Sequence, residues 1–179
     1  MNMGNNRWKG LLLFCLGLSV SAAFCMKWLE TEFLVNGEKF TMAGLEISYS
    51  KEKVAAIMSG VDSHTKSVLG YQLYFDFAFM AGVYPGIAAL CMIAREKLVS
   101  PGFRKFFFML AFMQSLAWVA DINENLYLLR WLKQPVIGDN FSLYHFIVYA
   151  KWIMALAGFF ISVFVLLLTR KSKRRKLFS

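Results

Sequence analysis

Four apolar runs dominate the chain, and each is long enough to cross a membrane as a helix. They cover about residues 10–28, 71–94, 104–129 and 146–169. A transmembrane helix needs about 20 apolar residues, and lipid forces its backbone to hydrogen-bond within the segment. Only 17% of the residues are charged, whereas soluble domains have about 25%. The sequence therefore predicts an all-α, multi-pass membrane protein whose residues 1–179 form a single four-transmembrane-helix bundle.

The basic residues lie at three places that a four-span chain brings to one side of the membrane. One group precedes the first run, a second separates the second and third runs, and a third follows the fourth. Because loops rich in Lys and Arg stay cytoplasmic, both termini and a basic tail over residues 170–179 are predicted to be cytoplasmic. The groups are Arg7 and Lys9; Arg95, Lys97, Arg104 and Lys105; and Arg170, Lys171, Lys173, Arg174, Arg175 and Lys176.

This distribution also accounts for the net charge of +9. A strongly basic protein can bind nucleic acid, but here the positive charge follows the topology, so no nucleic-acid partner is predicted. The C-terminal cluster suits anionic headgroups, and membrane lipids are the predicted partners.

The first apolar run has two interpretations, which stay open. Trp8 and Trp28 lie about 20 residues apart, roughly 30 Å along a helix, which matches the hydrocarbon thickness. Interfacial tryptophans at both ends are typical of a retained span. Alternatively, Ser21-Ala22-Ala23 offers small residues at which a signal peptide would be cleaved.

A small extracytoplasmic segment of mixed charge, residues 30–69, separates the first two spans. Asn36-Gly37 predicts a tight turn between residues 33–35 and 40–42, which would form a short hairpin. The segment is interpreted either as a cap over the bundle or as a lid over a lateral cavity.

Helix signals follow the hairpin. Ser50 is predicted to begin a short helix that Gly60 ends. Asp62 or Ser63 is then predicted to cap the helix that leads into the second span.

The third span ends in a polar stretch. Asp121, Glu124 and Asn125 stand at positions i, i+3 and i+4, so they share one helical face. Gln114 and Trp118 extend the same stripe toward the start of the span. Carboxyl groups at membrane depth are costly and are functional by default. We therefore predict that this face lines a site.

Ionisable residues of two other spans lie at the same depth. Spans two and four enter from outside, so Asp76 and Lys151 lie near their outer ends. Span three arrives from inside, which brings Asp121 and Glu124 to the same outer third of the bilayer. The predicted ligand-binding residues are Asp76, Trp118, Asp121, Glu124, Asn125 and Lys151, supported by Gln72, Tyr84, Gln114, Tyr149 and Trp152.

Three functions are compatible with this cluster. Lys151 can neutralise only one of the three carboxyl groups, so another must be protonated, bind a cation or meet Arg130 or Lys133. The preferred interpretation is a protein that binds a lipid or small amphiphile, with Lys151 holding an anionic group. The alternatives are an intramembrane enzyme that uses Asp121 or Glu124 as the catalytic acid/base on a lipid-soluble substrate, and a structural or assembly subunit.

The remaining motifs exclude several kinds of site. His64 and His145 lack the spacing of metal ligands, so no metal and no cofactor are predicted. Cys15, Cys25 and Cys91 form no CxxC pair, which argues against a thiol oxidoreductase.

Gly82 and Gly86 form a GxxxG spacing in the second span. This spacing lets two helix backbones approach closely, because glycine has no side chain. The two glycines are therefore predicted to contact a second copy of the chain or another membrane protein.

Three polar signatures together resemble a known pattern. They are Asp76-Phe77-Ala78-Phe79 with Tyr84, then Asp121-x-x-Glu124-Asn125, then Lys151 before a long apolar tail. Over nearly its full length the chain is similar to bacterial four-span integral membrane proteins with this pattern. The resemblance implies the four-span topology, the inward facing of these residues and a bacterial inner (plasma) membrane location. It implies no activity.

Overall fold

The computed structural model describes the backbone of residues 3–175 and the side chains of residues 6–170, so residues 176–179 of the predicted basic tail lie outside the described part of the chain. Four helices are long and apolar enough to cross a membrane, which confirms the all-α bundle. The elements are α1 (Met3–Leu29), the 3-10 turn η1 (Glu30–Glu32), β1 (Leu34–Val35), β2 (Glu38–Lys39), the π-helical turn η2 (Gly44–Ser48), α2 (Lys51–Gly60), α3 (Ser63–Arg95), α4 (Pro101–Lys133) and α5 (Phe141–Arg175).

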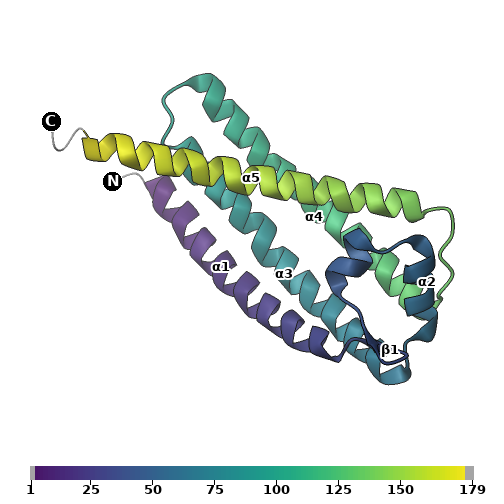
Figure 1. Cartoon of the computed structure of the whole chain (residues 1–179). Helices are drawn as coiled ribbons and strands as arrows, with labels where there is room; N and C mark the ends of the chain where they lie inside the picture. Colours follow the sequence, from purple (N-terminus) through teal and green to yellow (C-terminus); the bar gives the residue numbers. More distant parts are fainter. Residues whose placement is uncertain (1–2, 176–179) are drawn as a thin grey trace.

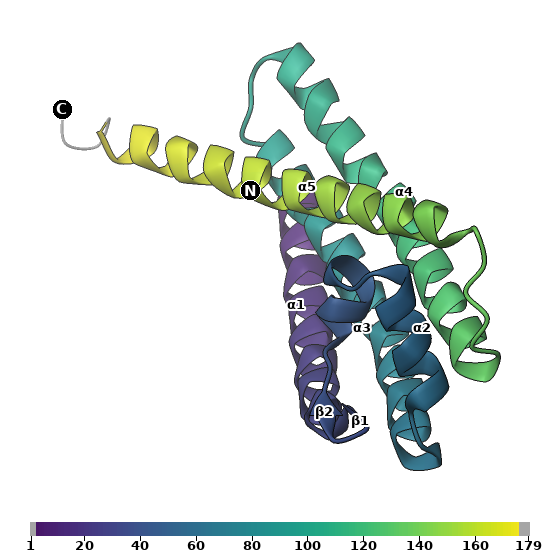
Figure 2. The ribbon, with the colours of Figure 1, turned by 45° about the vertical axis from the view of Figure 1, so that its right-hand side comes forward.

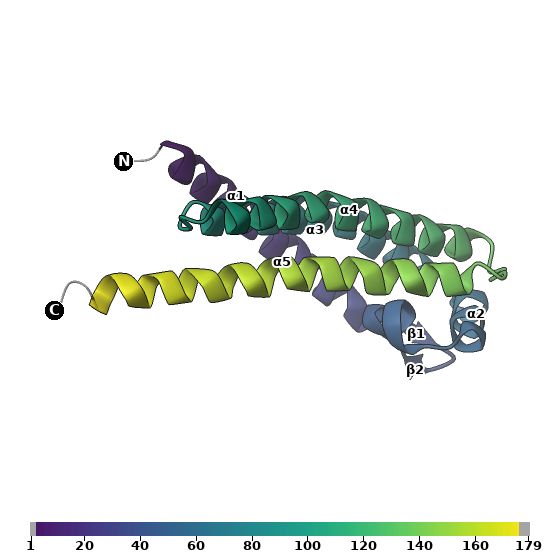
Figure 3. The ribbon, with the colours of Figure 1, turned by 90° about the horizontal axis from the view of Figure 1, so that it is seen from above.

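The central helix of the bundle is α3, against which α1, α4 and α5 all pack. Both termini and the α3–α4 connection lie at one end, which we call the basic end, and residues 30–62, which we call the cap, lie at the other (Figure 1). Helix α5 runs obliquely across the bundle, and its last turns point away from it (Figure 2). Seen from above, α4 and α5 run side by side (Figure 3).

The long helices extend beyond the predicted apolar spans, and α3 begins at a polar cap eight residues before its span. At the start of α3, the Asp62 carboxylate accepts a hydrogen bond of 2.7 Å from the backbone N–H of Thr65. This contact satisfies one of the unpaired donors of the first turn. The predicted cap at Asp62 is therefore confirmed, and the segment between the first two helices ends at residue 62 rather than 69.

A two-residue turn sets the hairpin of the cap. Asn36 and Gly37 have φ values of 50° and 82°, the positive angles that a type I′ turn requires. The turn pairs Val35 with Glu38. The second strand therefore covers residues 38–39, not 40–42 as predicted.

A hydrophobic core joins the cap to the bundle. Phe40 and Met42 lie outside the strand and pack in this core beside the apolar face of α2. As predicted, Ser50 is the N-cap of α2. The main core residues are Phe33, Phe40, Met42, Leu45, Val54, Ile57 and Met58 of the cap, packed against Val68, Leu69 and Leu73 of α3, Leu128 and Trp131 of α4, and Tyr144 and Val148 of α5. Burial of this many apolar side chains fixes the cap over the ends of α3, α4 and α5.

The GxxxG face of α3 packs within the chain. A Cβ atom on Gly82 would lie 2.8 Å from the Cys15 carbonyl oxygen and would also meet Ser19, and one on Gly86 would lie 3.1 Å from Cys15 Cβ. The small residues thus allow close approach of α1 and α3. A partner helix on this face would have to displace α1.

Candidate functional site

Four elements bring charged side chains together beneath the cap. Helix α3 supplies Asp76, α4 supplies Asp121 and Glu124, α5 supplies Lys151, and η2 supplies Glu46. The four residues from the long helices are all less than 9% exposed. The predicted burial of an Asp/Glu/Lys cluster is confirmed.

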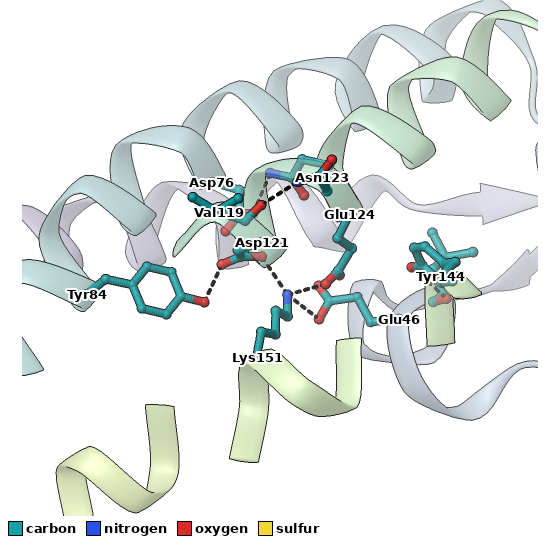
Figure 4. Close-up of polar contacts among 11 residues, drawn as sticks. Glu46, Asp76, Tyr84, Val119, Asp121, Asn123, Glu124, Tyr144 and Lys151 are labelled. Atoms are coloured by element: carbon teal, nitrogen blue, oxygen red, sulfur yellow. Dashed lines mark hydrogen bonds and ion pairs between the residues drawn. The ribbon is translucent and has the colours of Figure 1, made fainter. Parts of the chain in front are cut away.

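Lys151 is the centre of this cluster (Figure 4). Its ammonium nitrogen lies 2.6 Å from Asp121 Oδ1, 2.5 Å from Glu124 Oε2 and 3.5 Å from Glu46 Oε2. One cation therefore bridges α4, α5 and the cap. We call Lys151, Asp121, Glu124 and Glu46 the Lys151 cluster.

Two hydrogen bonds connect α3 to α4 beside this cluster. The Tyr84 hydroxyl donates to Asp121 Oδ2 at 2.7 Å. The Asn125 side-chain amide donates to Asp76 Oδ2 at 2.6 Å. Asp121 thus uses one carboxylate oxygen for Lys151 and the other for Tyr84, which fixes its orientation.

The charges of the site do not balance. Three carboxyl groups surround one ammonium group, and Asp76 adds a fourth carboxyl group nearby. Removing a charge from water costs several kcal/mol, which a close ion pair offsets only partly. Within residues 6–170, the buried oxygens Glu124 Oε1 and Asn125 Oδ1 also have no hydrogen-bond partner. Such an arrangement costs more than helix packing alone requires.

Glu46 belongs to the cap, and its environment favours the neutral acid. Burial raises the pKa of the Glu46 carboxyl above its ordinary value of 4.5, opposed by the ion pair with Lys151 and reinforced by the charge of Asp121. A raised pKa means that the folded protein binds this proton more tightly than the unfolded chain does. The stabilisation is complete below pH 4.5 and is lost as the pH rises through the raised pKa.

A Glu46→Gln variant should therefore gain stability relative to the wild type as the pH rises, and the gain should vanish below pH 4.5. The measurement is the free energy of unfolding of both proteins in mild detergent across this pH range. Glu52→Gln is the control, because hydrogen bonds from its own backbone and from Ser50 lower the pKa of Glu52, so its stabilisation is lost as the pH falls. A difference between Glu46→Gln and wild type that does not change with pH would contradict the prediction.

A cavity of about 290 Å³ adjoins the cluster; most of its lining is apolar, and we call it the polar cavity because it also contains the charged side chains of the site. Asp121 and Lys151 form part of its wall, whereas Glu124 lies behind them. The cavity is lined by Ala23, Met26 and Lys27 of α1; Glu30, Met42 and Glu46 of the cap; Gln72, Asp76, Phe79, Val83 and Tyr84 of α3; Asp121 of α4; and Lys151, Trp152 and Ala155 of α5.

An apolar groove of about 300 Å³ continues from this cavity toward the basic end. The two share Val83, Trp152 and Ala155 as lining residues. The groove is lined by Leu12, Cys15, Leu16 and Ser19 of α1; Gly82, Val83, Gly86, Ile87 and Leu90 of α3; and Trp152, Ala155, Leu156 and Phe159 of α5. The polar cavity and the apolar groove therefore lie end to end between α1, α3 and α5.

Three of the predicted supporting residues, Gln72, Tyr84 and Trp152, line the polar cavity. Three other predicted residues lie elsewhere. Gln114 donates a hydrogen bond of 3.0 Å to the Met154 carbonyl oxygen and so joins α4 to α5. It also lines a separate pocket with Trp118, next to Trp8 of α1. Tyr149 is half exposed and packs on His145.

Glu46 was not among the predicted site residues, because it belongs to the short segment between the long apolar runs. The signal was present, because Glu46 stands alone between Leu45 and Ile47 in a stretch without other charges. A carboxyl group flanked by apolar residues is a candidate for burial near the bundle.

Lys151 occupies the point at which the three carboxyl groups converge. Among the side chains that the structure describes, those of residues 6–170, no three His, Cys, Asp or Glu gather in a way that could hold a metal ion. The chain matches no family model, no curated protein and no solved structure. Any function is therefore inferred from the residues and geometry of the chain itself.

Proposed function

We propose that this protein binds a membrane amphiphile, with the polar head in the polar cavity and the hydrocarbon chain in the apolar groove. The observation that carries the proposal is that the two hollows share Val83, Trp152 and Ala155. Ligand pockets of about 300–1,000 Å³ are usually apolar with a few polar groups that fix orientation. The two adjoining hollows fit this description and also match the two halves of an amphiphile.

The groove supports entry from the bilayer. Its rim on α1 includes Leu16, and its rim on α5 includes Leu156 and Phe159, all of them exposed. Exposed apolar side chains on a membrane-spanning helix contact lipid tails. A chain in the groove can therefore exchange with the bilayer sideways, without crossing the cap.

The proposal is tested with a substitution that blocks the junction of the two hollows. Ala155→Phe places an aromatic ring where both share a wall, whereas Ile153→Phe, two residues earlier, adds the same ring on a lipid-exposed position. Mass spectrometry of the purified proteins should find the same bound amphiphile in wild type and Ile153→Phe. Ala155→Phe should retain about tenfold less, which corresponds to about 1.4 kcal/mol of binding free energy.

The competing explanation is that the charges only hold the helices together. It expects no bound amphiphile in the wild type, and equal effects of ligand addition on the thermal stability of wild type and Ala155→Phe. A ligand that binds only the folded state raises its stability. Either of those two results would remove the support for a binding function.

We also propose that the cap faces the extracytoplasmic side of a bacterial inner membrane. Support comes from Arg95, Lys97, Arg104 and Lys105 around the α3–α4 connection, since basic loops stay cytoplasmic. In intact cells, a membrane-impermeant maleimide should label a cysteine that replaces exposed Glu38 in the cap. It should not label one that replaces Val99 at the basic end, which is 93% exposed. The reverse labelling pattern would invert the orientation.

A further inference from the structure

The two cations that line the polar cavity are already paired. Lys151 contacts Asp121 at 2.6 Å and two further carboxyl groups. Lys27 lies 2.5 Å from Glu30. An anionic head could reach Lys151 only by breaking buried ion pairs, which changes the expectation that Lys151 holds an anion; the Lys27 side chain is 80% exposed, and its surface pair with Glu30 holds the ammonium group only weakly.

The unused groups of the cavity are acceptors. Asp76 is 8% exposed and accepts one hydrogen bond, from Asn125, and among the side chains of residues 6–170 it has no cationic partner. Gln72 is 3% exposed, and its buried Oε1 has no hydrogen-bond partner in the same part of the chain. The two side chains are four residues apart, so they share one face of α3. Both line the polar cavity.

The side chains that line the cavity also have an excess of acidic groups. Four carboxyl groups and two ammonium groups face the cavity: Glu30, Glu46, Asp76 and Asp121 against Lys27 and Lys151. An anionic head would meet this acidic excess without a free donor. A neutral hydroxyl head would satisfy hydrogen bonds but leave the excess charge. A protonated amine supplies both the positive charge and up to three donors.

We propose that the amphiphile carries a protonated primary amine, which pairs with the Asp76 carboxylate and donates to Gln72 Oε1. The proposal rests on the amphiphile-binding function and specifies its ligand. Phe79, Tyr84 and Trp152 also line the cavity, and aromatic rings attract cations. The class of ligand is a single-chain amine, whether it comes from the bilayer or from solution.

The test compares the binding of three headgroups that are attached to the same dodecyl chain. Dodecylamine, dodecanol and dodecyl sulfate are titrated into the full-length protein in a neutral detergent, and each dissociation constant is measured directly by isothermal titration calorimetry. The amine should bind about tenfold more tightly than the alcohol, a difference of about 1.4 kcal/mol. The sulfate should bind more weakly than the alcohol.

Asp76→Asn tests the carboxylate directly. Its side-chain oxygen can still accept the Asn125 hydrogen bond, so the fold should be kept while the preference for the amine over the alcohol disappears. Asp139→Asn is the matched control, because it removes an exposed carboxylate of the α4–α5 connection and should leave the preference unchanged. If Asp76→Asn does not fold, Gln72→Leu replaces it, and the preference for dodecylamine over dodecyltrimethylammonium, which has no donor, should be lost.

The outcomes separate the two proposals. If none of the three compounds binds, amphiphile binding itself is overturned. If the alcohol or the sulfate binds as tightly as the amine, or if Asp76→Asn and Gln72→Leu keep their preferences, only the amine assignment is overturned. If a short soluble amine such as butylamine binds as tightly as dodecylamine, the apolar groove is not used, which also contradicts an amphiphilic ligand.

Discussion

Replacing Lys151 with methionine is expected to destabilise the protein by about 3–5 kcal/mol, the usual cost of leaving buried charges without their partner. Methionine preserves most of the side-chain volume, so the loss reflects charge rather than a cavity. The variant leaves Asp121, Glu124 and Glu46 facing one another without the ammonium that now lies between them. The measurement is the free energy of unfolding in mixed micelles of mild and denaturing detergent.

Two further variants isolate the cause. Lys51→Met removes an exposed lysine that lies 3.8 Å from Asp139, and surface pairs contribute about 1 kcal/mol or less. Adding Glu124→Gln to Lys151→Met removes one of the stranded charges and should recover part of the stability. A loss below about 1 kcal/mol for Lys151→Met would mean that its charge does not neutralise the cluster.

The sequence was sufficient to predict the helices and the meeting of their charged residues. Apolar runs longer than a bilayer is thick can fold in lipid only as helices. Alternation of helix direction then places polar residues from the ends of different runs at one depth. The sequence alone therefore predicts that Asp76, Asp121, Glu124 and Lys151 lie together, because each is costly to expose to lipid.

Rotational position about the helix axis was harder to predict. Trp118 lies three residues before Asp121, so helical periodicity put the two on one stripe. In the structure Trp118 lines a different pocket, next to Trp8 of α1. Periodicity places residues on a face, but a helix packed between several neighbours has more than one buried face.

The cap was only partly predictable, because short elements depend on contacts that lie far apart in the sequence. The turn at Asn36-Gly37 and the caps at Ser50 and Asp62 follow from local chemistry and were predicted. The π-helical turn at residues 44–48 was not predicted. It brings Glu46 to Lys151, which lies 105 residues later in the chain.

Phe33→Ala is expected to destabilise the cap by about 3–5 kcal/mol, the typical cost of truncating a buried phenylalanine. Phe33 is fully buried and stacks on Phe40 with ring centroids 5.0 Å apart. Its loss leaves a void between the hairpin and the helices that the two-residue strands cannot close. Limited proteolysis should show faster cleavage within residues 30–62, while the four long helices keep their helical circular dichroism.

The neighbouring residue provides the control. Leu34→Ala removes a side chain that is 42% exposed, so it should leave cleavage close to the wild-type rate. Equal cleavage of Phe33→Ala and the wild type would show that the cap does not depend on this core.

Phe33→Ala also distinguishes a passive cap from a lid. Met42 and Glu46 close one side of the polar cavity from the cap, and Glu46 reaches Lys151 only while the cap is seated. If the cap retains the ligand, Phe33→Ala should speed release of a bound amphiphile far more than Leu34→Ala does, because looser packing opens the cavity more often. If release is unchanged, exchange proceeds through the apolar groove between α1 and α5, and the cap only positions Glu46.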